Sequence, residues 1–451
     1  MKKYIVIPAN TDLNRGDQAL VWESIRVAKE AGLIGEYYLM DAGETEEERI
    51  LQSSQSLQEG YQFIRRILPH PGRGEKEGQN QFYSKKQLVK WGLRAFKDGI
   101  SRAMLLSKFK IVNRLGYSFL NAEEKKSLEI IKDADAVIVK GGGFIHSYGG
   151  ITAPYYIFYS LYNILLAKKY KKKIFIMPNS FGPFKGIFVP FLVKKALNNV
   201  EFISARERIS SEQLGKVLNK KISVYPDLGF FLEESKGEKI DSLIYRKNIP
   251  FGQKQIVAIT VRPYRFPKSE NPNLLYKKYI KSIADTIIWL NNKGFFVLLV
   301  SQTLGPSSHE DDRKAIKDVL NNLNNTENVE VIEEMDLNCR DLKFLYGQVD
   351  YLIGTRFHSV IFSISSNTPA IAISYGGNKG EGIMKEIGLQ DFEIPIEKVS
   401  FSVLTQKFEE LRNNKKYYLD KVAKYMEKAK KEREYLIETI RQLYKYGDSD
   451  K

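Results

Sequence analysis

The sequence predicts an α/β protein made of two domains, each built around a parallel β-sheet. The chain has 451 residues. Because domains usually hold about 100–200 residues, this length favours two domains and an appendage. Hydrophobic residues make up 43% of the chain, which is enough to fill two cores. Short apolar runs alternate with segments of helical periodicity, an order typical of parallel strands joined by helices.

The first half of the chain shows this alternation on both sides of a basic segment. We expect a first domain at 1–232, with a basic insertion at about 45–121 that is rich in Lys, Arg, Gln and Gly. The insertion is interpreted either as a solvated lid or as an electrostatic dock for an anionic lipid or polymer. The expected strands are Lys3–Pro8, Glu36–Met40, Ala136–Lys140, Lys173–Pro178 and Phe202–Ala205, and the expected helices are Ala19–Ala31, Glu46–Leu57, Lys85–Arg102, Ala153–Lys168, Phe188–Asn198 and Ser210–Leu218.

The second half predicts a second sheet and a helical end. A charged segment at 233–253 is expected to be a linker, followed by a domain at 253–398 and a helical extension at 399–451. The extension carries an apolar stripe at helical spacing, which we expect to pack on the first domain or on a second subunit. The expected strands are Ile256–Val261, Phe295–Ser301, Val329–Ile332, Tyr351–Gly354 and Ala370–Tyr375, and the stripe is Tyr418, Val422, Met426, Ala429, Leu436, Ile440 and Leu443.

Charge and cysteine content limit the partners and the location. The chain holds 70 Lys and Arg against 54 Asp and Glu, a net charge of +16 that suits an anionic partner or a solubilising surface. The basic residues are dispersed and form no nucleic-acid module, so we expect no nucleic-acid binding. Cys339 is the only cysteine, and no metal-ligand spacing or cofactor fingerprint is present. No apolar run reaches the roughly 18 residues of a membrane span, so we expect a cytoplasmic protein that contacts membranes only at its surface.

Glycine-rich and charged segments follow several of the predicted strands. In parallel sheets the carboxyl ends of the strands meet at one edge, where ligands bind. Two Rossmann-like domains facing a cleft would bring such segments from both sheets together. The segments are 14–17, Gly141–Gly143, Asn179–Pro183, Arg206–Arg208 and Gly354–His358.

The first domain supplies candidate anion ligands. Arg206 offers a planar fork that can hold a carboxylate or phosphate, although a salt bridge to a neighbouring glutamate is the structural alternative. Gly141, Gly142 and Gly143 allow close approach of a ligand and free N–H groups, or they form a tight turn. Asn179 follows the next strand along the chain.

The second domain supplies a candidate acid–base pair at the start of a helix. A helix start favours anions, Arg356 adds a fixed charge there, and His358 can donate or accept a proton near neutral pH. The alternative is a histidine that only caps the helix. Lys379 is expected either to neutralise a phosphate or to be solvated. Asp17 could orient a hydroxyl or cap the following helix, and His146 could contact a substrate.

Taken in order, these segments resemble the polysaccharide pyruvyl transferase family. The resemblance rests on Arg15–Ala19, Gly141–Gly143, Asn179–Pro183, Ser204–Glu207, Pro226–Leu228 and Gly354–His358, and extends from the first strand to about Leu389 without the basic insertion.

This resemblance implies a GT-B-like fold and transfer of a pyruvyl unit from phosphoenolpyruvate to a sugar. The acceptor would belong to a cell-surface polysaccharide or its lipid-linked precursor, and the product would be a pyruvate ketal. It also implies donor-site roles for Arg206, Arg356 and His358, and makes Lys379 the matching lysine. His146 stands where many members carry an acidic or amide residue. A glycosyltransferase that uses a nucleotide sugar and a non-catalytic polymer-binding member remain the alternatives.

Overall fold

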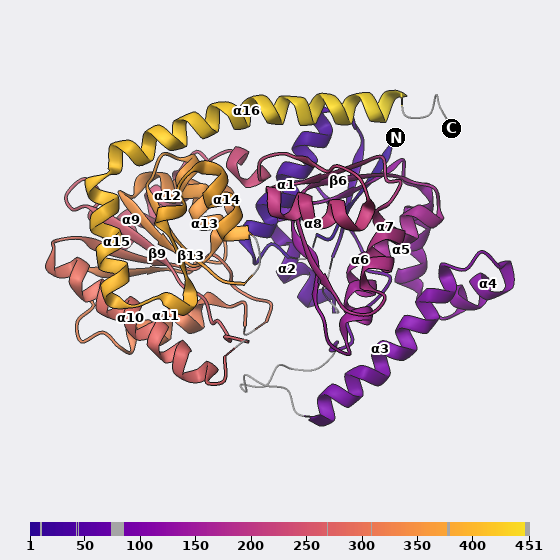
Figure 1. The fold of residues 1–451 in the computed structure, drawn as a ribbon, viewed down its shortest axis with the longest axis horizontal. Helices are drawn as coiled ribbons and strands as arrows, with labels where there is room; N and C mark the ends of the chain where they lie inside the picture. The colour runs from indigo at the N-terminus through magenta and orange to yellow at the C-terminus, as the bar shows by residue number, and fades with distance from the viewer. Residues whose placement is uncertain are drawn as a thin grey trace. The chain divides into compact units, whose positions relative to one another are not determined.

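The computed structural model describes residues 1–9, 11–41, 43, 45–73, 85–267, 269–307, 309–376 and 379–446. The chain divides into two compact units (Figure 1). Unit 1 comprises Met1–Asp12, Leu20–Asp227 and Lys431–Lys451, and unit 2 comprises Leu13–Ala19 and Leu228–Lys430. Each unit is an α/β body with its own parallel sheet.

The sheet of unit 1 follows the order β3-β2-β1-β4-β6-β7-β8, and β5 pairs with β6. Every one of these pairings is parallel. The central strands are completely buried because helices cover both faces, so apolar residues follow one another without alternation. The strands are β1 (Lys3–Ile7), β2 (Glu36–Met40), β3 (Gln62–Ile64), β4 (Ala136–Val139), β5 (Gly142–Tyr148), β6 (Lys173–Lys185), β7 (Phe202–Ala205) and β8 (Ser223–Val224).

The helices of unit 1 connect these strands, and two of them stand away from the sheet. In Figure 1, α3 and α4 extend outward from the sheet of this unit. The helices are α1 (Arg15–Glu30, whose first turn belongs to unit 2), α2 (Glu46–Gln58), α3 (Lys85–Leu105), α4 (Lys110–Ser118), α5 (Ala122–Asp133), α6 (Ala153–Lys169), α7 (Val189–Leu197) and α8 (Arg208–Leu218).

The sheet of unit 2 follows the order β11-β10-β9-β12-β13-β14, again with parallel pairings. Its strands are β9 (Ile256–Thr260), β10 (Phe296–Val300), β11 (Val329–Ile332), β12 (Tyr351–Gly354), β13 (Ala370–Ser374) and β14 (Glu393–Pro395). Its helices are α9 (Glu238–Arg246), α10 (Pro272–Asn292), α11 (Asp312–Leu320), α12 (Cys339–Gln348), α13 (Phe357–Ser365), α14 (Lys379–Ile387), α15 (Phe401–Asn413) and α16 (Lys415–Tyr446, whose residues from Lys431 onward belong to unit 1), with short 3₁₀ turns at Leu228–Phe231, Gln390–Phe392 and Ile396–Lys398.

The two parallel sheets confirm the predicted fold class, but two segments expected to be loops are regular structure. The glycine run is not a loop, because Gly142 opens β5 and pairs with Asn179. Strand β6 continues to Lys185 for the same reason, since its second half pairs with β5. Glycine and proline have low strand propensity, which is why the sequence pattern predicted turns here.

Three further boundaries differ from the expectation. Helix α1 begins at Arg15, four residues early, because the side chain of Asn14 accepts hydrogen bonds from the N–H groups of Gly16 and Asp17 at 3.1 and 3.2 Å. The expected linker contains α9, which buries Ile240 and Leu243. The basic insertion contributes β3, which pairs with β2, so part of the range 45–121 belongs to the sheet.

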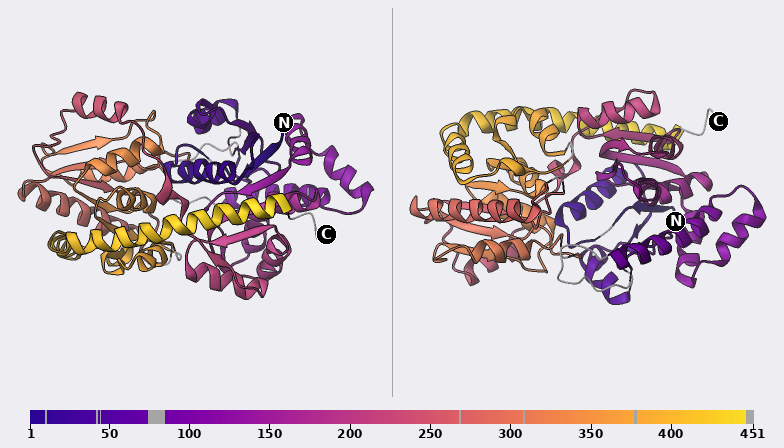
Figure 2. Two further views of the ribbon diagram at one scale, coloured as in Figure 1. Left: turned by 90° about the horizontal axis from the view of Figure 1, so that it is seen from above. Right: turned by 60° about the horizontal axis from the view of Figure 1, so that its bottom comes forward.

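The C-terminal extension consists of two helices, α15 and α16, viewed from above in Figure 2. Five residues of the apolar stripe on α16 are buried, as expected of a packing surface: Tyr418, Val422, Ala429, Leu436 and Ile440 are each at most 1% exposed. The other two, Met426 and Leu443, are half-buried. Tyr418 exchanges two hydrogen bonds with the backbone of Ala370, at 2.9 and 3.1 Å. Among the helices that the structure describes, none is long and apolar enough to cross a membrane.

Candidate functional site

In unit 1, Arg206 lies directly after β7 and is 2% exposed. Its Nη1 donates to the carboxylate of Asp227 at 2.6 Å, and its Nε donates to the hydroxyl of Ser180 at 2.7 Å. These two bonds fix the plane of the guanidinium. The third nitrogen, Nη2, is buried and has no hydrogen-bond partner within the described part of the chain. A buried charged donor left without a partner is costly, so this nitrogen marks a place for an anionic ligand.

The glycine strand leaves space beside this nitrogen. A Cβ atom added to Gly143 would lie 3.2 Å from Nη2 of Arg206. Next to it, Asn179 donates through Nδ2 to the carbonyls of Lys140 and Met177 at 2.8 and 2.9 Å. Its Oδ1 is buried and has no partner among the described residues. A donor and an acceptor without protein partners therefore lie beside one glycine-rich strand.

The salt bridge to a neighbouring glutamate, the structural alternative for Arg206, is present with Glu207. Glu207 lies 3.9 Å from Nε of Arg206 and accepts a hydrogen bond from Ser180 at 3.0 Å. Burial raises the pKa of its carboxyl group, while the guanidinium opposes the shift. Lys140, which was not predicted as a site residue, directly follows β4 and is 1% exposed. Its position directly before the glycine run is a signal that could have identified it as a candidate site residue.

In unit 2, Arg356 follows β12 and precedes α13, so it lies at the N-terminus of that helix. Its Nε and Nη2 contact the same oxygen, Oδ1 of Asp312, at 2.8 and 2.6 Å, and Nη2 also donates to the carbonyl of Glu310 at 3.0 Å. The other carboxylate oxygen of Asp312 accepts two backbone N–H bonds, from Gln302 and Thr303. Arg356 is therefore held rigidly in place.

The pKa values of Asp312 and Arg356 depend on burial and on the charge of the partner residue. Burial raises the pKa of Asp312 to about 6, and Arg356 opposes that shift, so the carboxylate is ionised at neutral pH. Burial disfavours the charge on Arg356, but the Asp312 carboxylate more than compensates and raises the pKa of the guanidinium. Asp312 lies 44 residues before Arg356 in the sequence, so no local pattern predicted the contact.

His358 lies in the first turn of α13 and is 8% exposed. The start of α1 approaches it very closely, because a Cβ atom added to Gly16 would lie 2.1 Å from Nδ1 of His358. Only glycine fits there without displacing the imidazole ring. Asp17 in the same turn accepts a hydrogen bond from Asn14 at 3.1 Å, which places it in the capping arrangement of α1.

A second arginine of unit 2, Arg262, was missed by the sequence reasoning. It follows β9 in the way that Arg206 follows β7, and that position was the available signal. Its guanidinium carbon lies 4.0 Å from the ring centre of Tyr375, a cation–π contact. Its Nε is buried and unbonded within the part of the chain that the structure describes.

Three further residues that the sequence predicted for the site are His146, Gly141 and Lys379. His146 lies in β5, where its Nδ1 is 2.9 Å from the carbonyl of Gly143, and burial lowers the pKa of its ring. Gly141 is packed against the carbonyl of Pro178, 3.0 Å from an added Cβ atom. Lys379 opens α14, and its side chain lies outside the described part of the structure.

A cavity of about 170 Å³ lies near the ends of β1 and β4 in unit 1. Its wall combines three aromatic side chains with aliphatic and polar ones, and the buried Oδ1 of Asn163 has no partner among the described residues. Apolar walls with a few polar groups are typical of small-molecule sites. The lining residues are Ile7, Pro8, Arg66, Val139, Phe144, Tyr156, Tyr159, Ser160, Asn163 and Ile164.

Solved structures define the class of fold. The chain is similar to the MnaA protein of S. aureus, solved with UDP, with a TM-score of 0.51 and 12% identity over 94% of this chain and 91% of that one. It is equally similar to a UDP-N-acetylglucosamine 2-epimerase from Listeria monocytogenes, described as putative, with a TM-score of 0.53 and 12% identity over 94% and 90% of the two chains. These likenesses show a GT-B-type fold.

Sequence comparison defines the family. Residues 14–377 match the polysaccharide pyruvyl transferase family, and the chain belongs to it. The chain is also 26% identical to the amylovoran biosynthesis protein AmsJ of Erwinia amylovora over 305 residues, which cover 66% of this chain and 70% of that protein. The predicted family is thereby confirmed, and the protein is a transferase with a role in polysaccharide modification.

Proposed function

We propose that the protein works in the cytoplasm and transfers the pyruvyl unit of phosphoenolpyruvate to a sugar of a polysaccharide or of its lipid-linked precursor, forming a pyruvate ketal. The observation that carries this proposal is Nη2 of Arg206, a buried guanidinium nitrogen that has no partner among the described residues and lies beside a glycine strand. Phosphoenolpyruvate brings a carboxylate and a phosphate, the groups that arginine binds best. Family membership supports the same donor.

The reaction needs a proton at one carbon and loses phosphate from its neighbour. The methylene carbon of the donor accepts a proton, and a cationic centre develops at the carbon that carries the phosphate. One sugar hydroxyl attacks this carbon and gives its proton to the group that protonated the methylene carbon, which restores the general acid. The bond to the phosphate oxygen breaks, inorganic phosphate leaves, and a second hydroxyl closes the ketal and loses its proton to the phosphate.

Residues of both units have roles in this proposal. Arg206 binds an anionic group of the donor, and Asp227 and Ser180 position it. Arg356, fixed by Asp312, stabilises charge on the donor, and His358 supplies the proton as general acid. Lys379 neutralises the phosphate, and His146 and the cavity of about 170 Å³ in unit 1 contact the acceptor.

The test compares two arginines at one strand end. Arg206→Lys keeps the charge but loses the planar fork, so we expect kcat/KM for phosphoenolpyruvate to fall about 10²–10³-fold. Arg208→Lys is the matched control, because Arg208 is exposed, and its kcat/KM should stay unchanged. Phosphate release in the presence of acceptor measures both.

A second variant protects this test against misfolding. Gly143→Ala adds a methyl group 3.2 Å from Nη2 without altering Arg206, and should abolish thermal stabilisation by phosphoenolpyruvate. The proposal fails if phosphoenolpyruvate does not stabilise the wild-type protein while a nucleoside diphosphate sugar does. Retained activity in Arg206→Lys would remove Arg206 from the donor site.

A further inference from the structure

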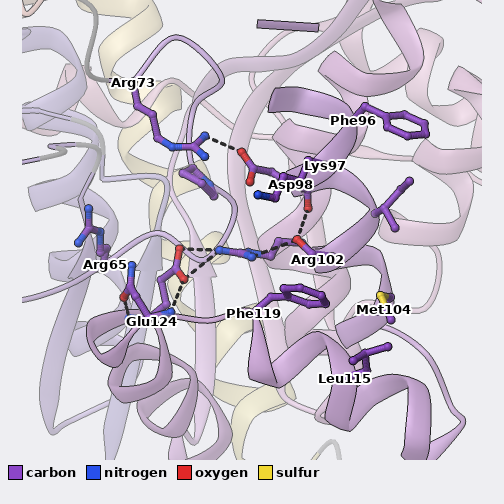
Figure 3. A pocket seen from close by; sticks show the side chains of 14 residues that line it. Arg65, Arg73, Phe96, Lys97, Asp98, Arg102, Met104, Leu115, Phe119 and Glu124 are labelled. Atoms are coloured by element: carbon purple, nitrogen blue, oxygen red, sulfur yellow. Dashed lines mark hydrogen bonds and ion pairs between the residues drawn. The ribbon is translucent and has the colours of Figure 1, made fainter. Parts of the chain in front are cut away.

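Helix α3 directs its polar face toward the protein. Arg102 donates two hydrogen bonds from Nη2 to the carboxylate of Glu124, at 2.8 and 2.9 Å, and one from Nε to the carbonyl of Ile67 at 3.0 Å. Asp98 accepts from Arg73 at 2.5 Å. Figure 3 shows both ion pairs on the inner side of the helix. A surface helix normally directs its apolar stripe inward. In α3 the last residue, Leu105, enters the core, but the turns before it contact the protein through buried ion pairs.

The outer face of α3 is apolar and exposed. Residues 89, 93, 96 and 100 recur at the spacing of one helical face. The side chains on that face are Val89, Leu93, Phe96 and Ile100, exposed by 64%, 69%, 69% and 48%.

Helix α4 extends this apolar surface. Ile111 and Leu115 are 85% and 50% exposed, and the residues that flank the helix, Phe109 and Phe119, are 76% and 52% exposed. Phe96 and Ile100 of α3 line one open pocket of about 710 Å³ together with Leu115 and Phe119, so the apolar residues of the two helices adjoin (Figure 3). The ion pairs of Arg73 with Asp98 and of Arg102 with Glu124 line the polar side of the same pocket. We call residues 85–120 the α3–α4 hairpin. A contiguous exposed apolar surface of this kind marks an interaction site.

The α3–α4 hairpin is also strongly basic. It holds nine Lys and Arg residues against the single acid Asp98, so it carries +8 of the net charge of +16 of the chain. Lys86, Lys90 and Lys97 are exposed, and their spacing places them along one flank of the apolar face. Lys108, Lys110 and Arg114 are exposed on and beside α4.

We propose that the α3–α4 hairpin docks the protein on the surface of an anionic lipid bilayer. The helices lie in the plane of the interface, their apolar side chains enter the boundary between headgroups and acyl chains, and their lysines contact lipid phosphates. The charge selects this occupant over a second copy of the chain, because two hairpins of +8 repel each other. This inference does not rest on the donor or on the chemistry proposed above.

The test is co-sedimentation of the full-length protein with vesicles. We expect binding to vesicles of phosphatidylcholine with 30% phosphatidylglycerol, at least about tenfold stronger than to pure phosphatidylcholine, and weakened by salt. Phe96→Glu should reduce this binding more than about tenfold, and Lys90→Glu at least about fivefold. Phe191→Glu on α7 is the matched control, since Phe191 is a helical phenylalanine that is 62% exposed, and should bind as the wild type does.

Three outcomes would overturn the proposal. These are equal binding to both kinds of vesicle, unchanged binding of Phe96→Glu, and a smaller molar mass of Phe96→Glu in light scattering, which would make the surface an interface between copies. Phosphate release with a soluble acceptor is measured in parallel and should be unchanged in Phe96→Glu. Loss of vesicle binding with intact turnover separates this proposal from the proposed function.

Discussion

Helices α3 and α16 have the same kind of sequence and opposite surroundings. Both are long, rich in lysine, and carry an apolar stripe at helical spacing. On α16 most of the stripe is buried, with Leu436 at 1% exposure, whereas on α3 Leu93 is 69% exposed. The polar face of α16 meets solvent, whereas that of α3 forms buried ion pairs. Helical periodicity therefore defines a face, but it does not say what that face contacts.

The largest effect is expected from the inner face of α3. Arg102→Ala leaves the buried carboxylate of Glu124 without its cationic partner, and the N–H of Asn121, which also donates to it, cannot neutralise its charge. The free energy of unfolding should therefore fall by about 3–5 kcal/mol, as measured by denaturant unfolding of the purified protein. Replacing both charges, as Arg102→Met with Glu124→Gln, keeps the acceptor for Asn121 and should recover most of the stability. If Arg102→Ala is as stable as the wild type, the polar face of α3 does not attach it to unit 1.

A matched leucine pair tests the comparison directly. Leu436→Ala on α16 removes a buried side chain and should cost about 2–5 kcal/mol. Leu93→Ala on α3 makes the same chemical change on an exposed face and should stay within about 0.5 kcal/mol of the wild type. Thermal and denaturant unfolding of both variants measure the two losses of stability. Equal losses would mean that something covers the outer face of α3 in the isolated protein.

The smallest effect is expected from the charged surface of α16. Arg433 donates two hydrogen bonds to Glu30, each of 2.8 Å, and these bonds lower the pKa of Glu30 below 4.5. A lowered carboxyl pKa gives stability that is present above the unfolded value and is lost as the pH falls through the folded value. Arg433→Ala should therefore cost less than about 1 kcal/mol at pH 7 and almost nothing near pH 3. A melting-temperature difference that grows on acidification would contradict this.

The candidate site was only partly predictable from sequence. Arg206 and Arg356 were identified because a cation directly after a buried strand lies at the edge where ligands bind in parallel sheets. Their partners were identified less well. Asp227 lies in Pro226–Leu228, one of the segments that carry the family resemblance, whereas Asp312 lies in none of them, and its contact joins α11 to the end of β12. The sequence also did not predict the close approach of Gly16 to His358, because 342 positions separate the two residues.

By itself, the sequence determined the two parallel sheets, most helices, and the family, because these depend on local periodicity and on short ordered motifs. The tertiary structure alone decided how the glycine run and the segment after it extend as paired strands, since that pairing supplies their backbone hydrogen bonds. It alone decided that Nη2 of Arg206 is buried and has no hydrogen-bond partner in the described part of the chain. It also decided which of two amphipathic helices is buried, because burial depends on what lies opposite a face, and that information is not local.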